Sequence, residues 1–178
     1  MKITFWLSLL WLVSCSPTEV EFEYPDRINQ PSEVIASEGC GNVYLYQFLD
    51  GKNALVVRID GTNSNLTKER QSVDLEEGNS IVSVTLEVAG NSPDSIYFNY
   101  CNDVAFINQG RLDIYMGAKG RVNYSVSEDN PIKDPIWESN YKITVEILDL
   151  HLYDNTGNLK MVIDKIVFWD VAVGWMPG

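Results

Sequence analysis

Histidine and cysteine are scarce in this 178-residue chain, which has one histidine and three cysteines. One histidine is too few for a multi-histidine zinc site, and it argues against nucleophiles that need a histidine base. Bases are also few, because 13 lysines and arginines stand against 25 acids and give a net charge of -12. We expect no nucleic-acid partner, since such proteins need a basic surface. The sequence carries no motif of a known enzyme family, so we expect no catalytic residue, metal ligand or cofactor.

The N-terminal apolar run is too short to span a membrane. It covers residues 3–13, about half of the roughly 20 apolar residues that a spanning helix needs. Its length and the preceding Lys2 are typical of a secretory signal. The run ends in Leu12-Val13-Ser14-Cys15, which resembles the lipobox of bacterial lipoproteins. The resemblance implies cleavage before Cys15 and acylation of that cysteine, so that the lipid holds the protein on a membrane. The alternative is an ordinary secretory signal.

The residues after the lipobox bear on the location of the protein. Residues 1–14 would be removed, which leaves 12 bases against 25 acids and a domain that anionic headgroups repel, so the lipid must provide the anchor. Ser16, where aspartate would favour the inner membrane, implies the outer membrane of the cell envelope. Residues 15–38 contain three prolines and five glutamates, which predict a flexible acidic tether. An edge strand at residues 20–24 is the alternative. The folded domain is then expected at residues 39–178.

Cys40 and Cys101 are the cysteines left for the domain. The envelope outside the inner membrane is oxidising, so we expect a disulfide between them. It would close a loop of about 60 residues and stabilise the domain by about 4 kcal/mol on the chain-entropy model. Two buried thiols or one reactive cysteine are the alternatives.

Apolar and polar residues alternate along much of the domain, as is typical of β-strands. The predicted strands are residues 43–49, 54–60, 81–88, 96–101, 111–116, 121–126, 141–153 and 159–175. Gly117 to Gly120 predict a hairpin turn, and residues 141–153 are expected to be buried on both faces over part of their length. Only residues 66–70 suggest a helical turn. Eight or nine short-spaced strands predict an antiparallel β-sandwich, with a small β-barrel as the alternative.

Aromatic residues in the C-terminal third are the main candidates for ligand binding. Trp137, between prolines and acids, and Tyr141 are predicted to stack on sugar rings. Asn102 and Asp103 follow Cys101 and either line a pocket or cap a turn. Trp169 lies in an apolar segment and is expected to pack in the core.

Acidic segments offer weaker candidates. Residues 60–65 carry oxygen-bearing side chains in the manner of a calcium loop, but Gln71 stands where an EF-hand needs glutamate. We therefore expect the loop to satisfy its own backbone. Asp129, Asp134 and Glu138 could form a hydrolase site, although a chain with 25 acids brings carboxylates together by chance. Asp149 and His151 are expected to form a structural hydrogen-bonded pair.

These observations predict a lipid-anchored envelope protein with a non-catalytic binding or accessory structural role. Its partner would be an envelope protein or a glycan. The alternative is a carbohydrate-binding module that uses Trp137 and Tyr141, and a hydrolase built on the loop carboxylates is third. Residues 39–43, 99–103 and 174–178 resemble segments of small envelope lipoproteins, a resemblance that implies no particular activity.

Overall fold

The computed structural model describes residues 26–28, 37–49, 53–75, 81–89, 101, 112–133 and 139–174. Every element of regular secondary structure in this part of the chain is a β-strand. They are β1 (Asp26–Ile28), β2 (Ser37–Cys40), β3 (Tyr44–Phe48), β4 (Asn53–Ile59), β5 (Gln71–Asp74), β6 (Val82–Ala89), β7 (Leu112–Val126), β8 (Asn140–Tyr153) and β9 (Leu159–Gly174). The predicted all-β class is confirmed. Among the described residues, no helix could cross a membrane.

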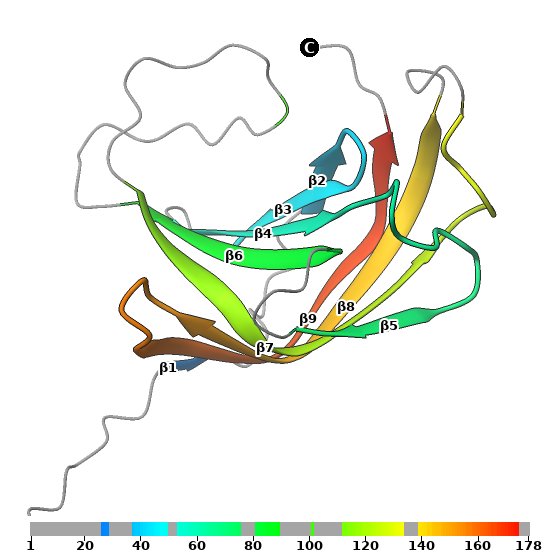
Figure 1. Ribbon diagram of the computed structural model, residues 1–178. Coiled ribbons are helices and arrows are strands. Elements are labelled where there is room, and N and C mark those ends of the chain that lie inside the picture. Colours follow the sequence, from blue (N-terminus) through cyan, green and yellow to red (C-terminus); the bar gives the residue numbers. More distant parts are fainter. Residues whose placement is uncertain are drawn as a thin grey trace, which may run out of the picture.

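The strands form one curled sheet in the order β1-β9-β8-β7-β6-β4-β3-β2, and β5 pairs with the second half of β7. Neighbouring strands are antiparallel, except that β1 runs parallel to β9. The curl brings β2 back towards the end of β9 (Figure 1). There Gly41 and Gly174 form an isolated bridge. The sheet is therefore nearly closed into a barrel shape, which corresponds to the small-barrel alternative.

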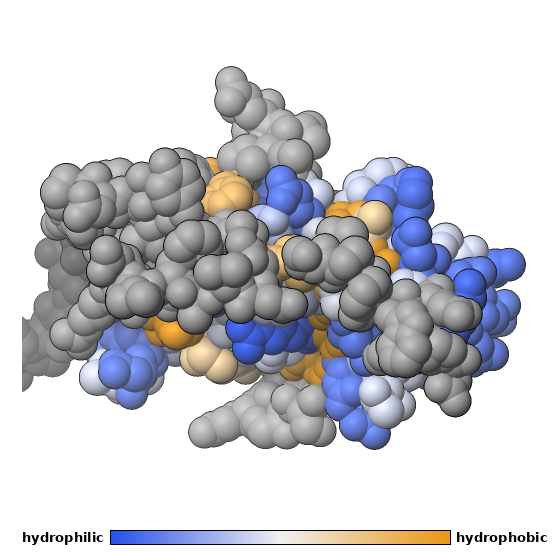
Figure 2. All heavy atoms as spheres, turned by 90° about the horizontal axis from the view of Figure 1, so that it is seen from above, coloured by the Kyte–Doolittle hydropathy of each residue, from blue (hydrophilic) through white to orange (hydrophobic). Residues whose placement is uncertain are grey.

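The inward side chains of the curled sheet form the hydrophobic core. Alternate residues of a strand point to the same face, so the apolar positions of each strand collect inside. The largest fully buried side chains are Phe168, Leu45, Leu55, Ile59, Leu86, Ile143, Ile147, Leu150, Leu152, Ile163, Ile166 and Val43. Each buried aliphatic or aromatic side chain contributes roughly 1.5–3 kcal/mol. On the outside, the view from above shows small hydrophobic areas scattered among hydrophilic ones (Figure 2).

β8 changes the parity of its buried residues near Asp149. Odd-numbered apolar positions from Ile143 to Ile147 are buried, and beyond Asp149 the even-numbered Leu150 and Leu152 are buried instead. Asp149 has a φ of 49°, a left-handed conformation that interrupts the regular alternation. Both sets of apolar residues therefore face the same core, and the prediction that they occupy opposite buried faces was wrong.

β7 is one long strand where the sequence predicted a hairpin. The register between β7 and β8 shifts on both sides of Lys119. Gly120 has a φ of 138°, and a Cβ atom there would lie 3.0 Å from the Leu148 carbonyl oxygen. The glycines thus bend the strand without reversing it. Its first half pairs with β6 and its second half with β5.

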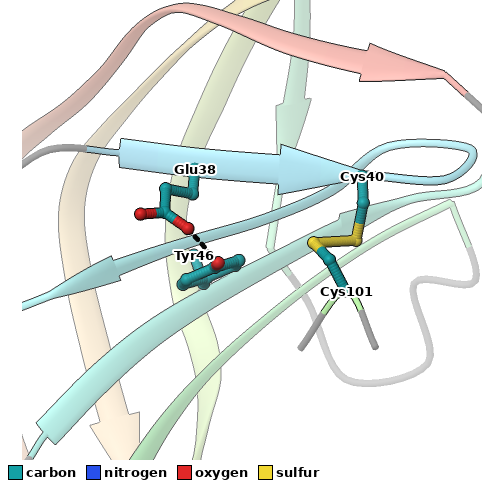
Figure 3. Close-up of a disulfide and its surroundings, with 4 residues drawn as sticks. All are labelled: Glu38, Cys40, Tyr46 and Cys101. Atoms are coloured by element: carbon teal, nitrogen blue, oxygen red, sulfur yellow. Dashed lines mark hydrogen bonds between the residues drawn. A yellow bond between two sulfur atoms is a disulfide. The ribbon is translucent and has the colours of Figure 1, made fainter. Parts of the chain in front are cut away.

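The predicted disulfide between Cys40 and Cys101 is present, and it fastens the end of β2 (Figure 3). On the neighbouring strand, the Tyr46 hydroxyl donates a hydrogen bond to the Glu38 carboxylate. Burial, together with this carboxylate, raises the pKa of Tyr46. β2 is therefore joined both covalently and by a polar pair to its surroundings.

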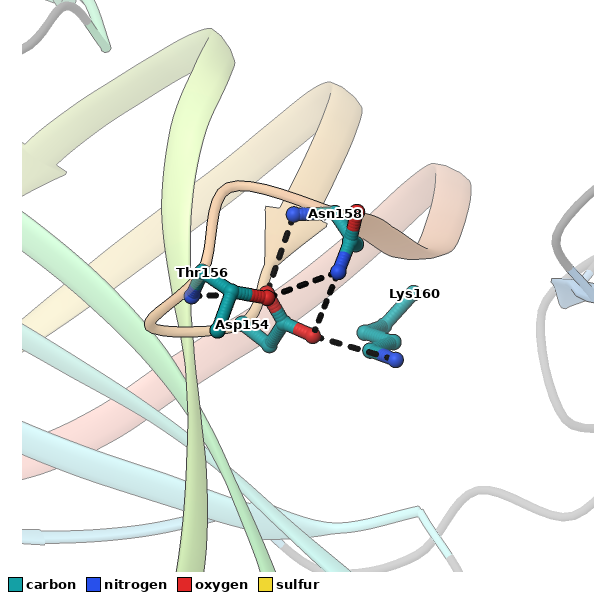
Figure 4. A network of polar contacts seen from close by, with 4 residues as sticks. All are labelled: Asp154, Thr156, Asn158 and Lys160. Carbon is teal, nitrogen blue, oxygen red and sulfur yellow. Dashed lines mark hydrogen bonds and ion pairs between the residues drawn. The ribbon is translucent and has the colours of Figure 1, made fainter.

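The hairpin between β8 and β9 is organised by one aspartate (Figure 4). Asp154 Oδ1 accepts hydrogen bonds from the backbone N–H groups of Thr156 and Asn158, both at 2.9 Å. Lys160 Nζ lies 3.1 Å from Asp154 Oδ2. The Thr156 hydroxyl and these donors lower the pKa of Asp154. This turn fills the gap between the predicted strands at residues 141–153 and 159–175, and it fixes the register of β8 against β9.

Part of the predicted tether belongs to the sheet. Asp26–Ile28 pairs with β9, and β2 begins at Ser37, before the expected start of the domain. Residues 1–25, with the predicted signal and Cys15, lie outside the described residues, as do residues 96–100 of a predicted strand.

Candidate functional site

Trp169 is the most exposed large apolar side chain among the described residues. It is 76 % exposed, whereas the adjacent Phe168 is fully buried. Between Phe168 and Val171 the register of β9 against β8 shifts by one residue, and Asp170 has a φ of 53°. This bulge lets two consecutive residues, Trp169 and Asp170, face solvent. The expectation that Trp169 packs in the core was therefore wrong.

The outer face beside Trp169 is built from four adjacent strands. Ser72, Asn123, Glu146 and Val167 form one row across β5, β7, β8 and β9. A groove of about 650 Å³ lies over this region, within the range of roughly 300–1,000 Å³ of small-molecule sites. It is lined by Arg70, Asn123, Tyr124, Ser125, Thr144, Glu146, Lys165, Val167 and Trp169.

Glu146 is the centre of the polar network in this groove. Its Oε1 accepts a hydrogen bond from Lys165 Nζ at 2.7 Å, and its Oε2 accepts one from Asn123 Nδ2 at 3.2 Å. Arg70 Nη2 also donates to Oε2. Lys165 makes the largest contribution to a lowered pKa of Glu146, and Arg70 and Asn123 add to it. The carboxylate is therefore held ionised and in one position.

The groups around Glu146 differ in their access to solvent. The side chain of Glu146 is 20 % exposed, while those of Arg70 and Lys165 are 62 % and 51 % exposed. Asn123 is only 6 % exposed. A fixed amide and carboxylate thus form the floor, and two cationic groups reach into solvent above it.

The Trp169 end of the groove is fixed by the bulge. The Asp170 N–H donates a hydrogen bond to Thr144 Oγ1 at 3.1 Å. Lys142 Nζ lies 2.6 Å from Asp170 Oδ2. These contacts hold the bulged backbone against β8, so the indole is presented beside the polar floor by a braced segment.

The residues singled out from the sequence as ligand-binding do not form this groove. Tyr141 is 3 % exposed, so it cannot offer a stacking face, and burial raises its pKa to about 12. Its hydroxyl has no hydrogen-bond partner among the described residues. This assignment was wrong because Tyr141 faces the core side of β8. Trp137, Asn102 and Asp103 lie outside the described residues.

The acidic loop at residues 60–65 satisfies its own backbone, as expected. Asp60 Oδ1 accepts from the N–H groups of Thr62 and Asn63 at 3.0 and 3.2 Å. The Asn63 side-chain amide, followed by these N–H groups, lowers the pKa of Asp60. No group of three or more His, Cys, Asp or Glu in the described part of the chain is arranged to hold a metal ion.

The remaining acidic candidates have structural contacts or were not described. Asp129 Oδ1 accepts a hydrogen bond from the Lys68 N–H at 2.7 Å. Asp134 and Glu138 of the suggested hydrolase site lie outside the described residues. His151 Nε2 lies 3.1 Å from Asp149 Oδ1, which confirms the expected pair.

The groove could not have been found from sequence pattern. Its residues come from the approach to β5 and from β7, β8 and β9, and they meet only through strand register. The only local signal was the alternation of polar residues on the outer face of β8. No protein-family model, curated protein or solved structure matches this chain.

Proposed function

We propose that this chain is a lipid-anchored protein of the bacterial cell envelope whose β domain binds glycans, without catalysis, through the groove beside Trp169. The observation that carries the proposal is the exposed indole next to a fixed network of hydrogen-bonding side chains. A sugar ring has an apolar C–H face that stacks on an aromatic ring, and its hydroxyl edge pairs with planar polar groups. The groove offers both kinds of surface side by side.

The lining of the groove favours a glycan over a protein at this position. Trp169 and Val167 provide its apolar surface, while Arg70, Glu146 and Lys165 provide charge. Protein-binding sites are more often marked by contiguous apolar patches with charged residues kept to the rim. Here the charged side chains occupy the centre.

A glycan array probed with the purified full-length chain tests the proposal. We expect binding to a defined set of glycans and loss of that binding in Trp169→Ala. Met116→Ala is the matched control, because Met116 is an exposed apolar residue at 49 % outside the groove. Near-UV circular dichroism checks that both variants fold. Absence of binding across the array, or equal binding by Trp169→Ala, would refute the proposal.

The lipid anchor has its own test. The lipobox at Leu12-Val13-Ser14-Cys15 supports acylation, and the acidic domain gives no electrostatic attraction to anionic membranes. We therefore expect Cys15→Ser to move the protein from the membrane fraction to the soluble fraction, with unchanged near-UV circular dichroism. A Cys15→Ser variant that stays with the membrane would contradict anchoring through this residue.

An accessory contact with an envelope protein is the second candidate function. Ile114 and Met116, two residues apart on β7, are 48 % and 49 % exposed, so they present apolar surface on one side of that strand. Mild cross-linking and pull-down from native membranes, with Cys15→Ser as control, should recover one envelope protein in stoichiometric amount. Loss of that protein in a doubly substituted Ile114→Ser, Met116→Ser variant would assign the contact, and unchanged recovery would exclude this surface.

A further inference from the structure

From the donors and acceptors of the Trp169 groove, we infer that its ligands are acidic glycans, in which a ring other than the stacked one carries a carboxylate. This inference rests on the proposed glycan-binding function and specifies its ligand class. Four features of the groove support it: a largely used acceptor, a surplus of donors, a local positive excess and the spacing of these donors from the indole.

The acceptor in the floor is largely used. The Glu146 carboxylate accepts hydrogen bonds from Arg70, Asn123 and Lys165, and a carboxylate has about four lone-pair sites. Glu146 therefore has little capacity left for the O–H donors of a neutral sugar. Its role is to position the two cationic side chains.

Donors remain in surplus. An arginine guanidinium has about five N–H donors and a lysine ammonium has about three. In the described part of the chain, the side chains of Arg70 and Lys165 each bond to Glu146, and both are more than half exposed. The remaining N–H groups point to an acceptor-rich ligand, and a carboxylate accepts without donating.

The groove also has a local positive excess. Arg70 and Lys165 share the single carboxylate of Glu146, whereas the whole chain has a net charge of -12. Lys142 and Arg121, by contrast, each have a carboxylate of their own, Asp170 and Asp74. A negatively charged ligand group is therefore attracted more strongly to Arg70 and Lys165 than to the rest of this outer face.

The spacing along β9 indicates more than one sugar ring. Lys165, Val167 and Trp169 all line the groove, with Lys165 and Val167 in the regular part of β9 and Trp169 at the start of its bulge. Residues two apart on a strand are separated by about 7 Å, so Trp169 and Lys165 lie about 13 Å apart along it. An oligosaccharide stacked on Trp169 would extend along the groove towards the cations, which is where the carboxylate is required.

Paired oligosaccharides test this inference. The probes are uronic-acid and sialic-acid oligosaccharides, each compared with its carboxyl-reduced form, and binding to the full-length chain is measured by calorimetry. We expect the acidic forms to bind at least about tenfold more tightly, the ratio that one charge-assisted hydrogen bond supports. Arg70→Gln and Lys165→Gln should each reduce this ratio. Lys119→Gln, which changes an exposed cation of β7 away from the groove lining and the bulge, should leave it unchanged.

The outcomes separate this inference from the proposed function. If both forms of a pair bind equally and Trp169→Ala abolishes both, the carboxylate preference is wrong while glycan binding stands. If no member of any pair binds, both the ligand class and the function are wrong. A preference that persists in Arg70→Gln and in Lys165→Gln would also overturn the assignment of the carboxylate to these residues.

Discussion

Phe168 and Trp169 are adjacent aromatic residues in opposite surroundings, one fully buried and the other 76 % exposed. We expect Phe168→Ala to lower the free energy of unfolding by about 3–5 kcal/mol, because it leaves a cavity in the core. Trp169→Ala should change it by less than about 0.5 kcal/mol, because the exposed ring fills no cavity. Urea unfolding of both variants measures these values. A loss of more than about 2 kcal/mol for Trp169→Ala would assign the ring to packing instead of binding.

Glu146 makes a pH-dependent contribution to stability. Lys165, with Arg70 and Asn123, lowers its pKa in the folded state, so the unfolded state holds the proton more tightly. The stabilisation is therefore present above the unfolded pKa of about 4.3 and is lost as the pH falls through the lower folded pKa.

Glu146→Gln tests this contribution. We expect the variant to be less stable than the wild type at pH 7 by about 0.2–1 kcal/mol, the range of solvent-accessible ion pairs. The difference should shrink as the pH is lowered below 4, as measured by urea unfolding across the range. Asp170→Asn, which removes an exposed ion pair outside the groove lining, is the comparison. A difference for Glu146→Gln that grows towards low pH would contradict the direction of the pKa shift.

At the scale of strands, the seam between β2 and the end of β9 depends on two glycines. Gly174 has a φ of 115°, and a Cβ atom there would lie 2.2 Å from the Ser139 carbonyl oxygen. Gly41 has a φ of 55°, with no atom within 4 Å of its Cβ position. A side chain at Gly174 would therefore meet both a steric clash and backbone strain, whereas a side chain at Gly41 would meet backbone strain alone.

We expect Gly174→Ala to destabilise the protein by roughly 2–5 kcal/mol, through strain and overpacking together. Gly41→Ala should cost about 1–2 kcal/mol, because only the left-handed conformation is penalised. Thermal unfolding of both variants compares the two effects. Equal losses of stability in the two variants would show that the close contact with Ser139 does not add to the destabilisation by Gly174→Ala.

The strands also show which parts of the fold the alternation of apolar and polar residues could predict. Alternation located β8 and β9 within one or two residues, because apolar residues of period two must face a core. It failed at Asp149, Asp170 and residues 117–120, since bulges and bends are set by the register of the neighbouring strand. Trp169 was assigned to the core for the same reason: its exposure follows from the bulge beside it.

At the scale of the whole molecule, the disulfide joins residues 61 positions apart. Replacing Cys40 and Cys101 together with serine should lower the free energy of unfolding by about 4 kcal/mol, because the unfolded chain regains the entropy of the open loop. Urea unfolding of the reduced wild type provides the control and should match the double variant. No change on reduction would contradict this contribution.

The fold class and the disulfide could be predicted from the sequence, whereas the groove beside Trp169 could not. Charge, cysteine number and strand pattern are summed over the chain, so they predicted the all-β class and the disulfide that the structure contains. The groove depends instead on which outer residues are brought into one row. Asn123, Glu146 and Val167 meet through pairing of β7, β8 and β9, and nothing in the order of the chain specifies that meeting.

The indole N–H signals of the ¹⁵N-labelled full-length chain report directly on glycan binding beside Trp169. Trp169→Phe identifies the signal of this residue among the five tryptophans. On titration with oligosaccharides that the array selects, we expect the Trp169 signal to shift saturably while the other indole signals move less. An unmoved Trp169 signal while the glycan binds, or no glycan binding at all, would contradict glycan binding beside Trp169.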